Sequence, residues 1–224
     1  MLRKIASSCL AIILVSSLSI SSFASDSVAN SISYEDASNE IEEFVFELNQ
    51  KYDQNFNITL HDLGRNYKAQ ELQKVKNDLF TIAEGDRKTT KEIQDINDWT
   101  YARKRSDIRP FGDLNVLVDK TRTYNKDTGS GYMVHINCSA TFEIEVDDNS
   151  KKDLYIAEVT DISTKGKNSQ DTWTAKESPR VSYGASRKSV TIAQKGSCYH
   201  YSPLWEGTYK FTATWKFPWS DFSN

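Results

Sequence analysis

The chain has few of the residues that usually hold metal ions. It contains three histidines and three cysteines in 224 residues, and no two of the histidines lie within seven residues of each other: His61, His135 and His200. Transition-metal sites usually draw several ligands from short local spacings, so we expect no metal site. Phosphate-binding glycine loops and the Gly-x-Ser-x-Gly motif of serine hydrolases are also missing. The sequence predicts no cofactor and favours a protein that is not an enzyme.

Positive charge is not in excess. The formal net charge is -3, and it becomes -5 if the two basic residues near the start, Arg3 and Lys4, are removed with a leader. A protein that binds nucleic acid or an anionic membrane surface usually carries a basic field. We therefore expect no nucleic-acid partner, and contact with a membrane only through export.

The chain also lacks a long uninterrupted apolar run. The longest candidate, residues 10–18, follows Arg3 and Lys4 and precedes a small-x-small sequence at residues 22–24. This order is typical of a secretory signal peptide, and the run is too short to span a bilayer. The sequence predicts a signal peptide over residues 1–24 and a secreted, extracellular protein that begins near Ser25.

Cysteine is scarce in the expected mature chain. Cys9 lies in the leader, which leaves Cys138 and Cys198 as the only thiols. Two cysteines in an exported protein favour a disulfide, which would close a loop of about 60 residues and contribute about 4 kcal/mol. The alternative is two separately buried thiols. No Cys-x-x-Cys spacing is present, so the predicted bond is structural.

Residues 25–110 have a mainly helical pattern. Ser33 followed by Asp36 is typical of a helix start, and apolar residues then recur at helical spacing as far as Tyr52. A short strand is possible at 55–61. The spacing predicts a second helix over 66–84, which ends at Gly85, and a third over 89–102. Two to three helices are therefore expected.

Residues 103–113 are the predicted domain boundary. They begin with the basic run Arg103, Lys104 and Arg105 and contain a proline and a glycine, which is typical of an exposed connection. A solvated linker is the favoured interpretation, and a protease-processing site is the alternative.

From residue 111 to 224 the apolar period changes to two. Alternation is clearest over residues 134–146 and 208–217, and weaker strands are expected at 114–124, 154–162, 180–183 and 188–193. Turn residues at 129–131 and 147–152 separate them. The sequence therefore predicts an α+β fold, in which an antiparallel β-sandwich of five to seven strands follows the helical segment.

Acidic residues offer only weak candidates for a site. Glu143 and Glu145 share one strand face about 7 Å apart, a separation that a glycosidase pair could have, but two exposed strand carboxylates explain them more simply. Residues 147–149, Asp-Asp-Asn, carry oxygen ligands for calcium without the full spaced loop, so a polar turn is the favoured interpretation.

Aromatic residues near the C-terminus give the remaining functional signal. Tyr209 and Trp215 alternate with polar residues, which places them in the core. Four others lie where alternation is poor and are predicted to form a ligand-binding surface: Tyr199, Tyr201, Trp205 and Trp219.

Three function classes follow from these observations. The favoured hypothesis is a secreted, non-enzymatic protein that binds a glycan or a protein at a cell surface. The alternatives are a secreted hydrolase that uses a carboxylate pair, and a secreted toxin or bacteriocin-like effector whose amphipathic strands act on a membrane.

Overall fold

The structure is a computed structural model that describes residues 31–96, 98–101, 115–129, 133–146, 153–168 and 172–222. These residues belong to one compact unit, Ser31–Asn224. The predicted signal peptide, the basic run at 103–105 and the acidic turn at 147–149 lie outside the described residues. No described helix is both long enough and apolar enough to cross a membrane.

The first helix, α1 (Tyr34–Tyr52), is confirmed. Its start is fixed by Ser33, whose Oγ accepts a hydrogen bond from the backbone N–H of Asp36 at 3.1 Å. The helix ends at Asp53, which adopts the left-handed conformation with φ 50°. Its buried face carries Ala37, Ile41 and Leu48.

The predicted second and third helices form one helix, α2 (Ala69–Gln94), so the helix end expected at Gly85 is wrong. Gly85 lies against Lys126, and a Cβ atom at this position would be 2.7 Å from the lysine Nζ. That Nζ donates a hydrogen bond to the Ile82 carbonyl oxygen at 2.9 Å. Gly85 therefore gives room to a side chain from a distant strand instead of ending the helix.

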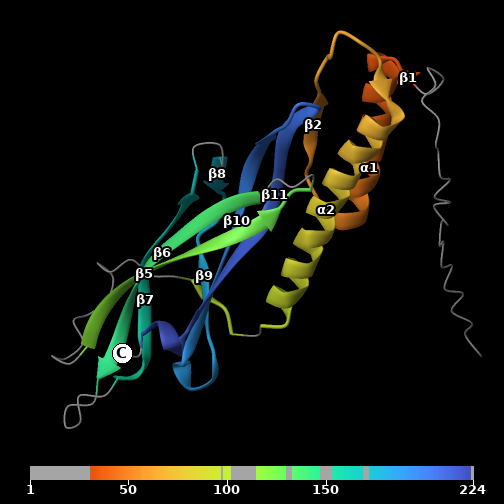
Figure 1. Ribbon diagram of the computed structural model, residues 1–224. Helices are drawn as coiled ribbons and strands as arrows, with labels where there is room; N and C mark the ends of the chain where they lie inside the picture. Colours follow the sequence, from red (N-terminus) through yellow and green to blue (C-terminus); the bar gives the residue numbers. More distant parts are fainter. Residues whose placement is uncertain are drawn as a thin grey trace, which may run out of the picture. The chain divides into compact units, whose positions relative to one another are not determined.

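Antiparallel strands make up the rest of the fold (Figure 1). One sheet has the order β2–β11–β10–β9–β4, and β8 also pairs with β10. A second sheet has the order β5–β6–β7, and β1 pairs with β3. The bounds of the first sheet are β2 (Asn57–Leu60), β4 (Thr100–Tyr101), β8 (Thr172–Ala175), β9 (Arg180–Tyr183), β10 (Ser189–Tyr201) and β11 (Trp205–Pro218). Those of the others are β5 (Asn115–Asp127), β6 (Met133–Val146), β7 (Asp153–Gly166), β1 (Ser31–Ile32) and β3 (Tyr67–Lys68).

The two larger sheets contact each other through their apolar faces, as a sandwich requires. Alternate residues of β6 are buried, which confirms the period of two seen in the sequence. Phe142 packs on Phe217 with ring centroids 4.8 Å apart, and Trp215 Nε1 donates a hydrogen bond to the Ile136 carbonyl oxygen at 3.0 Å. The α+β class is therefore confirmed. The described residues of the C-terminal half form seven strands, β5 to β11, which is the upper end of the predicted range of five to seven.

The helices share this core. Helices α1 and α2 lie side by side (Figure 1), and α2 contacts both β11 and β5. Strand β2, from the helical segment, adds to the edge of β11 with Leu60 opposite Trp205. Buried residues of the helices and of both sheets thus form one hydrophobic cluster.

The predicted disulfide between Cys138 and Cys198 is wrong in this structure, where both residues are buried thiols that are not at bonding distance. Cys138 lies on β6 opposite Arg122 and Thr164, whereas Cys198 lies on β10 opposite Tyr209 and Trp173. The two strands belong to different sheets, and a disulfide needs Cα atoms within about 7 Å of each other. Burial raises the pKa of the Cys138 thiol to about 12, so this thiol is unreactive at neutral pH.

A candidate ligand-binding surface

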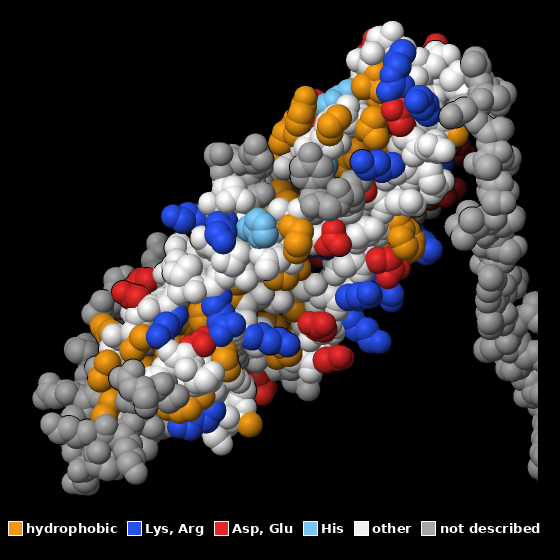
Figure 2. Space-filling view, viewed as in Figure 1, with side chains coloured by type: hydrophobic (Ala, Val, Ile, Leu, Met, Phe, Trp, Pro, Cys, Tyr) orange, Lys and Arg blue, Asp and Glu red, His pale blue; other side chains and the backbone are white. Residues whose placement is uncertain are grey.

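Two of the four predicted site residues are exposed next to each other at the end of β10. Tyr199 and Tyr201 lie on the same strand face because they are two residues apart, and they are 40% and 63% exposed. Figure 2 shows hydrophobic side chains beside a histidine near the tip of the β10–β11 hairpin. Exposed apolar side chains that are grouped, and not scattered singly, often mark a binding surface.

Two polar residues complete this group, Glu206 from β11 and His61, which directly follows β2. Tyr199 Oη donates a hydrogen bond to Glu206 Oε2 at 2.5 Å, and His61 Nε2 lies 3.7 Å from the same oxygen. The rings of His61 and Tyr201 have centroids 5.0 Å apart. We call these four residues, His61, Tyr199, Tyr201 and Glu206, the tyrosine cluster.

The hydrogen bond within the tyrosine cluster fixes both partners. The Glu206 carboxylate raises the pKa of Tyr199 because it accepts a hydrogen bond from the phenol hydroxyl, so this hydroxyl remains a donor at neutral pH. The other lone pairs of the carboxylate can still accept hydrogen bonds from a ligand. The cluster therefore presents two ring surfaces and a carboxylate held in place beside them.

Trp205, the third predicted site residue, is fully buried, so it is not part of an exposed surface. It begins β11 opposite Leu60, on the inward face, and its ring lies 4.1 Å from that of His200. Ser202 closes the turn before it, because its Oγ donates to the Trp205 carbonyl oxygen at 2.9 Å. Burial lowers the pKa of His200 to about 4, so this imidazole is neutral at pH 7. Trp205 and His200 support the strands beneath the tyrosine cluster.

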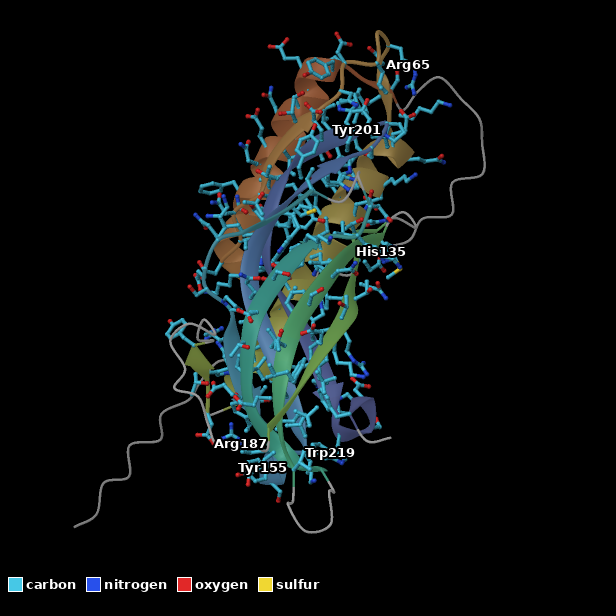
Figure 3. All side chains as sticks on the ribbon, turned by 90° about the vertical axis from the view of Figure 1, so that its left-hand side faces the viewer. Arg65, His135, Tyr155, Arg187, Tyr201 and Trp219 are labelled. Carbon is cyan, nitrogen blue, oxygen red and sulfur yellow. The ribbon has the colours of Figure 1, made fainter. Side chains whose placement is uncertain are left out.

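Trp219, the fourth predicted residue, lies at the other end of β11. It begins the short 3-10 helix η4 (Trp219–Asp221) and is half-buried, with Lys188 Nζ 3.7 Å from its ring centroid. Figure 3 shows Tyr201 and Trp219 near opposite ends of the strands. The structure thus brings together only Tyr199 and Tyr201 of the four predicted residues.

The sequence reasoning missed Glu206 and His61. Glu206 could have been found from the hairpin, because the short turn after β10 places Tyr201 and Glu206 opposite each other. In the sequence, His61 drew attention only as one of three widely spaced histidines. Its position depends on the pairing of β2 with β11, which joins segments about 145 residues apart and leaves no local signal.

A second feature is a polar cleft of about 1030 Å³, which runs between the end of α1, α2, β10 and β11. Asp86 of α2 closes part of the β11 edge, since it accepts hydrogen bonds from the Thr212 backbone N–H at 3.0 Å and from Gln54 Nε2 at 2.6 Å. The charged residues that line this cleft are Asp53, Asp86, Arg87, Lys91, Lys176, Glu177, Lys195 and Lys210.

The weaker candidates for chemistry find no support in the described residues. There, no group of histidine, cysteine and acidic residues could hold a metal ion. Glu145 accepts a hydrogen bond from the Tyr155 hydroxyl, and Glu143 lies opposite Leu117 and Glu158 on the three-stranded sheet. Both glutamates are half-buried on their strand, and they were expected to be exposed.

Comparisons of the chain with protein-family models, curated proteins and solved structures find no match.

Proposed function

We propose that this protein is secreted and binds glycans, without catalysis, on the tyrosine cluster. The observation that carries the proposal is the pair of exposed rings of Tyr199 and Tyr201, side by side on one strand. A strand rises about 3.3 Å per residue, so the two rings start about 7 Å apart. This places the two rings close enough for one glycan chain to contact both.

The polar members of the cluster support a sugar ligand over an apolar one. Sugar rings combine apolar C–H faces with hydroxyl groups at their edges. The tyrosine rings suit the faces, and Glu206 and His61 lie beside them with hydrogen-bonding atoms for the hydroxyls. The rings are also stiff, with two side-chain torsions each, so little entropy is lost when a ligand binds.

Export is the second part of the proposal. The basic start, the apolar run at residues 10–18 and the small residues at 22–24 support it. Intact mass of the protein recovered from the culture medium tests it. The expected mass corresponds to a chain that begins at Ser25, and a full-length chain confined to the cells would contradict it.

A glycan array followed by titration calorimetry tests the binding itself. We expect wild-type protein to bind at least one glycan class, and Tyr201→Ala to weaken that binding about tenfold or more, as the loss of an aromatic binding hot spot does. Tyr101→Ala is the matched control because Tyr101 is 71% exposed on β4, outside the cluster. The control should bind as wild type does.

Two results would contradict the proposal. One is equal binding by wild type and by a folded Tyr199→Ala, Tyr201→Ala double variant, with thermal unfolding as the check on folding. The other is release of new reducing ends from the bound glycan, which would point to a hydrolase.

A further inference from the structure

The exposed face of β8, β10 and β11 continues from the tyrosine cluster into the polar cleft. Antiparallel register arranges its side chains in rows across the strands. Tyr199 lies opposite Thr208 and Thr172, and Ser197 in the next row lies opposite Lys210 and Thr174. The tyrosines and the cleft lysines therefore share one surface.

A further row adds two more lysines. Lys195 lies opposite Thr212, and the Lys176 backbone N–H donates to the Lys195 carbonyl oxygen at 3.0 Å, which continues the β8 register. Lys176, Lys195 and Lys210 thus come from three neighbouring strands and all line the cleft. They lie one and two rows from Tyr199.

The cleft carries an excess of positive charge. Its lining has five basic residues and three acidic ones: Asp53, Asp86 and Glu177. One of the basic residues, Arg87, is already ion-paired with Glu84 at 2.8 Å, so the unbalanced charge comes from the lysines. Asp86 already accepts hydrogen bonds from Thr212 and Gln54, and Glu177 lies 3.8 Å from Lys195. Within the described part of the chain, no carboxylate forms an ion pair with the ammonium groups of Lys91, Lys176 or Lys210. A protein of net charge -3 thus holds a local cationic site.

We infer that the glycan held by the tyrosine cluster is acidic, and that the cleft lysines bind its carboxylate or sulfate groups. This inference rests on the function proposed above. Tyr199 and Lys210 are diagonal neighbours in the sheet, about 7 to 8 Å apart. A sugar stacked on Tyr199 therefore places the acidic group of the next sugar within reach of the Lys210 ammonium. Lys195 and Lys176 lie further along the same direction.

Two hexasaccharides of equal length test the inference, hyaluronan with carboxylates and chitin without them. We expect the protein to bind hyaluronan about tenfold more tightly than chitin in about 50 mM salt, and to lose most of this preference in about 500 mM salt, because ions screen exposed charges. The Lys195→Gln, Lys210→Gln double variant should lose the preference while its affinity for chitin stays unchanged. Lys216→Gln is the control, since Lys216 is exposed on the same strand but does not line the cleft.

The outcomes separate this inference from the proposed function. Equal binding of both hexasaccharides, unchanged in the double lysine variant, would overturn the inference and leave glycan binding intact. If neither hexasaccharide binds and the glycan array is also blank, the proposed function fails and the inference fails with it. Hyaluronan binding that Tyr199→Ala leaves unchanged, or that single-stranded DNA matches in affinity, would show an anion site unrelated to sugar stacking, which also overturns the inference.

Discussion

Lys126 offers a quantitative test of the contact between β5 and α2. Its side chain is 3% exposed, its Nζ donates to the Ile82 carbonyl oxygen at 2.9 Å, and the Phe211 ring centroid lies 5.5 Å from the same atom. Burial lowers the pKa of this lysine from 10.5 to about 8. Lys126→Met keeps a long apolar side chain and removes the charge.

The magnitude follows from the pKa shift. Between pH 8 and 10.5 the unfolded chain holds a proton on Lys126 that the folded protein has released, so folding stability rises with pH in this window. The penalty for the buried charge is fully present below pH 8 and is gone near pH 10.5. At 1.36 kcal/mol per pH unit, the 2.5-unit shift corresponds to about 3 kcal/mol.

Urea unfolding, followed by tryptophan fluorescence from pH 7 to 10.5, measures this effect. The free energy of unfolding of Lys126→Met, relative to wild type, should fall by about 3 kcal/mol from pH 7 to pH 10.5. Tyrosine ionisation affects both proteins and cancels in the difference. A difference between Lys126→Met and wild type that stays constant from pH 7 to 10.5 would mean that Lys126 is solvated and that β5 does not pack on α2 as described.

Three further predictions concern stability. Ser33→Ala removes the cap of α1 and should lower the free energy of unfolding by about 1 kcal/mol in urea titrations, whereas Ser33→Asp should preserve it. Gly207→Ala would place a Cβ atom 2.3 Å from the Asn57 carbonyl oxygen, so we expect at least about 2 kcal/mol of destabilisation, and slow exchange of the β2 amides in wild type should become fast. Burial lowers the pKa of His200 to about 4, so stability should fall as pH decreases from 6.5 to 4, and His200→Phe should flatten that part of the thermal unfolding profile. An unchanged acid profile in His200→Phe would contradict the burial of this imidazole.

Local patterns in the sequence predicted much of the fold. The alternation over residues 134–146 predicted β6, and Ser33 with Asp36 predicted the start of α1. Both signals arise from neighbours in the chain. The prediction that the second helix ends at Gly85 was wrong. Gly85 leaves room for the side chain of Lys126, which comes 41 residues later, and a local helical pattern carries no information about that contact.

The candidate site was only partly predictable for the same reason. Tyr199 and Tyr201 were identified from the aromatic composition of the C-terminal segment. Trp205 follows the short turn after β10, where the alternation of the strand is interrupted, so the sequence did not indicate that its side chain points inward. The disulfide prediction relied on the number of cysteines and the expected compartment, which do not tell which sheet each cysteine joins. His61 and the cleft lysines come together only through strand pairing across the whole chain.

We propose that Tyr199 and Tyr201 bind sugar. Calorimetric titration of wild type and of the Tyr199→Ala, Tyr201→Ala double variant with the glycan that the array selects tests it most directly. We expect measurable heat for wild type and none for the double variant at the same thermal stability. Equal affinities for the two proteins would contradict it.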